Sequence, residues 1–96
     1  MRYFHRTGVG PDEVVEAAEG HFGGRLQQVE SSARSRTYSG TIGKVELSVQ
    51  AEGGHYTLVT VTTDQPGESE LDKLAKRFLA LVHKHAHAEH QVRGAY

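Results

Sequence analysis

The chain has 96 residues and a formal net charge of −1, and 36% of its residues are hydrophobic and 24% charged. This length accommodates one soluble globular domain, residues 1–96, with a single modest core. The near-neutral charge argues against a nucleic-acid binder, which needs a basic face, and the longest apolar run, Phe78–Val82, is too short to cross a membrane. The absence of cysteine fits a cytoplasmic protein without disulfides.

Hydrophobic periodicity and turn residues divide the chain into a strand, a helix, four strands and a second helix. The expected strands are Arg2–Arg6, Arg25–Ser31, Ser35–Ser39, Lys44–Ala51 and His55–Thr63, and the expected helices are Pro11–Phe22 and Gly67–Gln91. Each helix has apolar residues along one side, and the central strands have one apolar face. We therefore expect an α+β fold of order β-α-β-β-β-β-α. It should be a two-layer sandwich, an antiparallel meander sheet of four to five strands with both helices on one face.

The central hairpin, Lys44–Thr63, has the clearest pattern, because apolar and polar residues alternate on both sides of a Gly-Gly turn. A two-residue loop would divide the apolar residues between the two faces of the sheet. A three-residue loop over Glu52–Gly54 keeps them together and pairs Leu47 with Val59. In that register Leu58 is the one strongly apolar residue on the outer face.

For two stretches, the sequence allows more than one local structure. Gly40–Gly43 is expected to be a turn, and the alternative is one bent strand over Arg36–Ala51 with a bulge at Gly43. Leu26 and Val29 have opposite parity, so one of them should lie outside the regular sheet.

The second helix has a capping signal at its start and a histidine-rich end. Ser69 and Asp72 resemble a capping box, and helical spacing places Asp72 on the polar side together with His83 and His87. At the end of the helix, His83, His87 and His90 share a face, and neutral imidazole is a good ligand for zinc, nickel or copper.

Three residues on one straight helix span too much of its axis to surround a single ion closely. A tight metal site would therefore need a ligand from elsewhere. The candidates are His5, His21, His55 and a second chain. The competing interpretation of the histidine-rich segment is a solvated helix end, where partly charged histidines interact favourably with the helix dipole.

The outer face of the hairpin is the second candidate site. Tyr56 and Leu58 form an aromatic–aliphatic pair there, which often marks a partner-binding surface. Arg34, Arg36 and Lys44 could add a small basic patch at one edge.

The chain contains none of the catalytic or phosphate-binding motifs that its glycines and histidines could have supplied. We therefore expect a small non-enzymatic interaction or ligand-binding module without a cofactor, which acts through the open sheet or a cleft beneath the helices and is able to form a homodimer. One alternative is a metal-binding protein that uses the helix-end histidines. Another is a small enzyme with His85 or His21 as general base.

Overall fold

The structure of the chain is a computed structural model that describes the backbone of residues 1–94 and the side chains of residues 1–84. Its elements in chain order are β1 (Arg2–Thr7), α1 (Pro11–Phe22), β2 (Gln27–Ser32), β3 (Ser35–Gly40), β4 (Gly43–Glu52), β5 (Tyr56–Thr63) and α2 (Glu70–Gly94). The order β-α-β-β-β-β-α expected from the sequence is confirmed, and most element boundaries agree within two residues.

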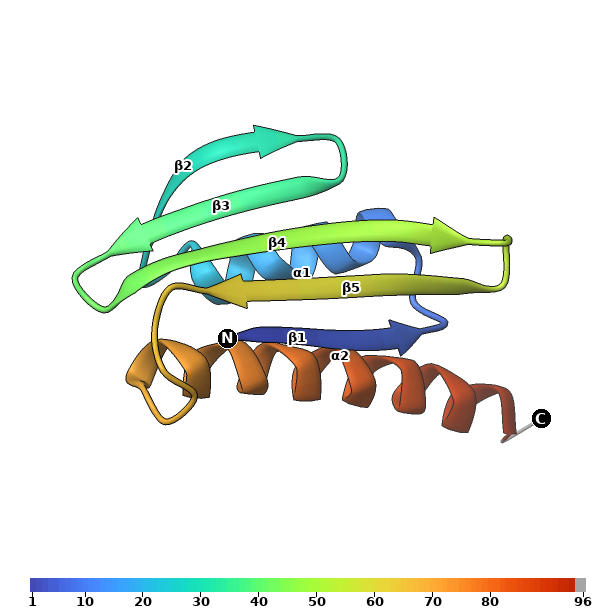
Figure 1. Ribbon diagram of the computed structural model, residues 1–96. Helices are drawn as coiled ribbons and strands as arrows, with labels where there is room; N and C mark the ends of the chain where they lie inside the picture. The colour runs from blue at the N-terminus through green and yellow to red at the C-terminus, as the bar shows by residue number, and fades with distance from the viewer. Residues whose placement is uncertain (95–96) are drawn as a thin grey trace.

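The strands form one antiparallel sheet of five strands in the order β1-β5-β4-β3-β2. The last four strands in the sequence form a meander, and β1 pairs with β5 at the opposite edge from β2. Both helices pack on one face of the sheet. In Figure 1, α1 lies behind the sheet, and α2 runs along its β1 edge. The predicted two-layer sandwich is therefore confirmed, and no element of the described residues covers its second face.

One hydrophobic core fills the space between the sheet and the helices. Its fully buried side chains come from alternate positions of β4 and β5 and from the apolar sides of the two helices. They include Val45, Leu47, Val49, Val59 and Val61 from the strands and Val14, Ala18, Phe22, Leu71, Ala75, Phe78 and Val82 from the helices. The alternation places most polar residues of β4 and β5 on the uncovered face, while Thr57 and Thr63 are buried on the covered one.

The β4–β5 hairpin has the predicted faces and a different register. Its loop has three residues, but they are Gly53–His55, so Leu47 pairs with Val61 and not with Val59. The φ angles of Gly53 and Gly54 are 59° and 74°, and both residues sit at the centre of a turn closed by the His55 N–H, which donates to the Glu52 carbonyl. Turns with two positive φ angles favour glycine, so the Gly-Gly pair moves the loop by one residue. The resulting two-residue shift in pairing leaves every side chain on its predicted face.

Strand pairing determines the local structure of the two stretches that the sequence left ambiguous, Gly40–Gly43 and the segment from Leu26 to Val29. Gly40 pairs with Gly43 across a tight turn, so the predicted turn is confirmed and the single bent strand is wrong. The pairing of β2 with β3 shifts between Gln28 and Glu30, which leaves Val29 outside the regular ladder while Leu26 is buried.

The start of α2 is more buried than the sequence suggested. Ser69 and Asp72 do interact as in a capping box, because the Asp72 N–H donates to the Ser69 hydroxyl. However, Asp72 is 0% exposed, so its predicted place on the polar side is wrong. Its carboxylate accepts hydrogen bonds from the hydroxyls of Tyr3 at 2.5 Å, Thr63 at 2.6 Å and Ser69 at 2.9 Å. A polar residue on a helix can be buried where the neighbouring elements supply donors.

These bonds control the ionisation of the buried carboxyl. Burial raises the pKa of Asp72, but the hydrogen bonds from Thr63, Tyr3 and Ser69 outweigh burial and hold the pKa below its usual value. The same bond to Asp72, with burial, raises the pKa of Tyr3 to about 12. The cluster joins β1, β5 and α2 at one end of the sandwich.

Candidate functional site

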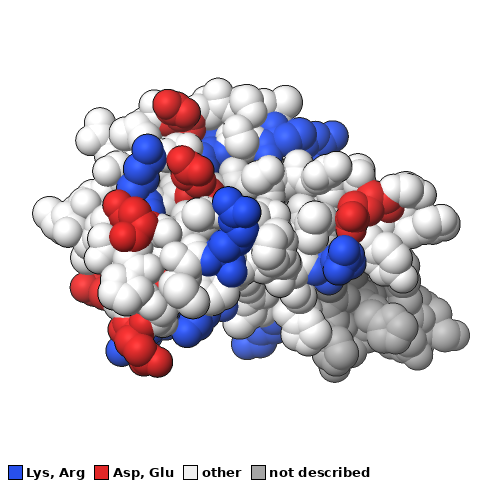
Figure 2. Space-filling view, in the orientation of Figure 1, with Lys and Arg blue, Asp and Glu red and all other residues white. Residues whose placement is uncertain are grey.

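The outer face of β1, β5 and β4 is the candidate functional site. The residues that point outward there are Arg2, Phe4 and Arg6 from β1, Tyr56, Leu58, Thr60 and Thr62 from β5, and Lys44, Glu46, Ser48, Gln50 and Glu52 from β4. Charged residues of both signs are dispersed over this face among neutral ones (Figure 2). Tyr56 and Leu58 both lie on it, as the sequence predicted.

The structure adds a third large apolar side chain to this surface. Phe4 is 62% exposed and Tyr56 is 57% exposed, while Leu58 is half-buried. Phe4 pairs with Thr60 and therefore lies diagonally across from Leu58, within reach of a long side chain. We call Phe4, Leu58 and Tyr56 the apolar stripe. The sequence did not reveal Phe4, because a strand as short as β1 does not indicate which of its faces is covered.

An ion pair crosses the apolar stripe. Arg6 on β1 bonds Glu52 on β4 at 2.9 Å, and β5 lies between these two strands. Leu58 is directly opposite Arg6, and Tyr56 is directly opposite Glu52. The Arg6 side chain must therefore pass over β5 at Leu58, which accounts for the half-buried state of Leu58.

The charges on this face are arranged by strand. The two arginines of the face, Arg2 and Arg6, are on β1, and the two glutamates, Glu46 and Glu52, are on β4. The outward positions of β5, which lies between them, carry no charge. Lys44 is also on β4 and lies 3.9 Å from Glu46, so β1 is basic, β4 is acidic on balance, and a neutral, partly apolar line lies between them.

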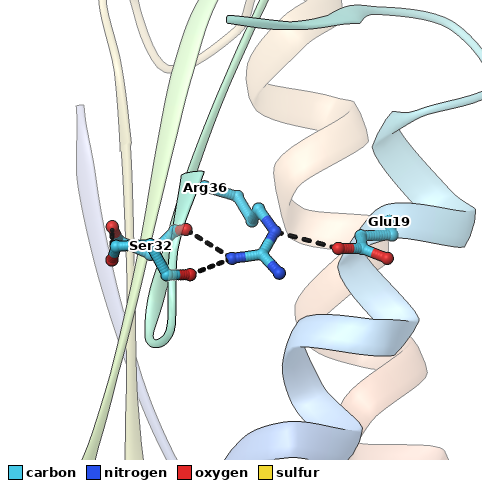
Figure 3. Close-up of polar contacts among 4 residues, drawn as sticks. Glu19, Ser32 and Arg36 are labelled. Carbon is cyan, nitrogen blue, oxygen red and sulfur yellow. Dashed lines mark hydrogen bonds and ion pairs between the residues drawn. The ribbon is translucent and has the colours of Figure 1, made fainter. Parts of the chain in front are cut away.

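The small basic patch predicted from Arg34, Arg36 and Lys44 does not form. Arg36 points toward the helices, and its side chain is only 15% exposed. Figure 3 shows it between α1 and the β2–β3 hairpin, where it bonds Glu19 at 2.9 Å and donates to the Ser32 carbonyl. Arg34 pairs with Asp12 at 3.2 Å. The sequence could not show this, because the faces of β3 were unknown.

The structure describes only part of the predicted histidine site. His83 is exposed on α2, whereas the side chains of His87 and His90, and that of His85, lie outside the described residues. The His83 ring lies next to His5 of β1, with 6.0 Å between the ring centroids. Among the described residues, no group of three or more metal-ligating side chains is gathered at one place.

His21, the other candidate general base, makes contacts that hold the fold together. Its Nε2–H donates to the Leu74 carbonyl at 2.9 Å, and its ring packs on Phe22 and Phe78. The described residues form a groove of ≈ 430 Å³ between the helices, and His21 is not among its lining residues. The groove is lined by Val9, Glu13, Val14, Glu16, Ala17, Leu81 and Val82.

Comparisons with protein-family models, curated proteins and solved structures found no match for this chain. Within the described residues, neither helix combines the length and the apolar character needed to span a membrane. The functional inference therefore depends on the surface and its chemistry.

Proposed function

We propose that the protein is a small interaction module that forms a homodimer by packing the outer faces of two sheets together. The proposal depends on one observation: the outward charges of β1 are basic, β5 carries none, and β4 carries two glutamates and one lysine, a net negative charge. A two-fold axis parallel to β5 places β1 of each copy over β4 of the other. Basic residues then face acidic ones twice, as a self-complementary interface requires.

The strand register supports this arrangement residue by residue. Arg2 and Glu46 both pair with Thr62, so they lie at the same height on opposite sides of β5. The two-fold axis therefore places Arg2 of one copy over Glu46 of its partner, and the reverse. Arg6 and Gln50 both pair with Leu58. The axis therefore places Arg6 of one copy over Gln50 of its partner.

The residues on the axis itself are suited to self-contact. Tyr56, Leu58, Thr60 and Thr62 would each lie close to their own copies, and none of them is charged. An axis along β4 would instead bring Glu46 against Glu46 and Lys44 against Lys44, and like charges in contact are unfavourable. The charge pattern thus favours β5 over its neighbour as the centre of the interface.

The size of this surface sets the expected affinity. Three strands about 4.8 Å apart and eight residues long cover a flat area of roughly 14 by 27 Å, or about 400 Å² per copy. The accessible area of a corrugated surface exceeds its flat projection, so the interface falls at the lower end of the size range for stable complexes. We therefore expect a dimer that dissociates in the micromolar range.

Sedimentation velocity over a concentration series tests the proposal. The wild-type chain should change from monomer to dimer with rising concentration, and Leu58→Glu should remain a monomer, because it places two carboxylates at the axis. Val29→Glu is the matched control, since Val29 is 52% exposed on the edge strand β2, away from the proposed interface. A wild-type chain that stays monomeric, or dimerisation lost in Val29→Glu and kept in Leu58→Glu, contradicts the proposal.

A further inference from the structure

A pair of histidines links β1 to α2. His5 is the middle inward-facing residue of β1, and His83 lies in the described part of α2, which runs beside that strand. Their ring centroids are 6.0 Å apart, and the ring planes meet at 74°. Residues that are distant in the sequence thus bring two imidazoles together at the edge of the sandwich.

The separation of the rings fits a shared metal ion. Metal–nitrogen bonds to histidine are about 2.1 Å long, so two rings bound to one ion have centroids roughly 5 to 6.5 Å apart. The observed separation lies in this range. Because the ring planes meet at 74°, the rings must rotate before one nitrogen of each histidine can reach a common ion.

We propose that His5 and His83 form a two-nitrogen site for a divalent transition-metal ion such as zinc, nickel or copper. These metals accept imidazole readily, and water or further ligands would complete the coordination. This site differs from the set predicted from the sequence, His83, His87 and His90, because it joins two elements. Metal binding would then tie the edge strand to the helix.

The site is independent of the proposed dimer surface. His5 points toward the helices, whereas the apolar stripe is on the opposite face of the sheet. Loss of metal binding would therefore leave dimerisation unchanged, and loss of dimerisation would leave metal binding unchanged. The two proposals fail separately.

Isothermal titration of the untagged chain with ZnCl₂, NiCl₂ and CuCl₂ tests the site. His5→Gln and His83→Gln should each weaken binding at least about tenfold, since even indirect partners of metal ligands contribute 10- to 100-fold. His55→Gln is the matched control, because His55 is in the exposed β4–β5 loop, and it should bind like the wild type. Circular dichroism of each variant checks that it is folded.

His87→Gln separates the two metal hypotheses. If His5→Gln binds as tightly as the wild type while His87→Gln does not, the metal is held by the end of the helix, and the proposed pair is wrong. Long-range ¹H–¹⁵N spectra of the histidine rings give a direct readout, in which zinc should shift the His5 and His83 signals together. Zinc-dependent shifts that spare His5 would also overturn the proposal.

Discussion

Replacement of Asp72 by asparagine should destabilise the fold strongly at neutral pH. The carboxylate is fully buried and accepts hydrogen bonds from three hydroxyls, those of Tyr3, Thr63 and Ser69. Asparagine removes the charge and turns one acceptor into an N–H₂ donor, so at least one hydroxyl loses its acceptor. Bonds to a charged group contribute about 1.5–3 kcal/mol each and neutral bonds about 1 kcal/mol, so we expect a loss of roughly 3 kcal/mol.

Urea unfolding followed by circular dichroism measures this loss. In a thermal melt, each kcal/mol corresponds to about 4–8 °C for a domain of this size, so the midpoint should fall by roughly 12–24 °C. Asp12→Asn is the matched control. The Asp12 side chain is 91% exposed in its ion pair with Arg34, and exposed pairs contribute at most about 1 kcal/mol.

The effect should also depend on pH with a defined sign. The folded-state pKa of Asp72 is below its usual value, so near pH 4 the unfolded chain binds more protons than the folded one. The stability that the carboxylate contributes is complete above the unfolded pKa of about 3.9 and is lost as the pH falls through the folded pKa. The difference between the wild type and Asp72→Asn should therefore shrink between pH 7 and pH 3. A difference below about 0.5 kcal/mol at pH 7, which is typical of a surface substitution, would refute the role assigned to this cluster.

Three further substitutions test separate parts of the fold by urea unfolding. Tyr3→Phe removes a donor to the buried carboxylate and should lower the free energy of unfolding. Tyr38→Phe should leave that energy unchanged or raise it by up to about 1 kcal/mol, because the buried Tyr38 hydroxyl has no hydrogen-bond partner among the described residues. Gly43→Ala should cost about 2–4 kcal/mol, because the φ of Gly43 is +128° and a Cβ would lie 2.9 Å from the Leu71 side chain. Equal losses in both tyrosine variants, or a neutral Gly43→Ala, would contradict these assignments.

The faces of the sheet were predictable from the sequence, and the register of the hairpin was not. Alternation along β4 and β5 depends on burial alone, which a shift of two residues does not alter. The register depends on which residues adopt positive φ in the loop, and a Gly-Gly pair allows more than one placement. The prediction paired Leu47 with Val59, and the structure pairs it with Val61.

The parts of the candidate sites that the sequence missed depend on long-range contacts. Phe4 could not be assigned to the outer face because β1 is short, and its pairing with β5 decides its direction. Asp72 was placed on the polar side because helical spacing does not show that Tyr3 and Thr63 supply donors from β1 and β5. His5 could be named only as one of several possible metal ligands, and the packing of β1 beside α2 distinguishes it.

The central claim, a dimer with its axis along β5, is tested most directly by mixing two charge-reversed chains. Arg2→Glu alone would place the new carboxylate of each copy over Glu46 of the other, and Glu46→Arg alone would place two guanidinium groups together. We predict that each variant is a monomer at a concentration where the wild type is a dimer. An equimolar mixture should form a dimer with one chain of each kind, because both contacts again join opposite charges.

Native mass spectrometry of the mixture identifies that heterodimer by its mass. Repulsion within one chain cannot explain a recovery that occurs only on mixing, so the result reports on the interface itself. A mixture that stays monomeric while the wild type forms a dimer would contradict the proposed interface, as would either variant that forms a dimer as readily as the wild type.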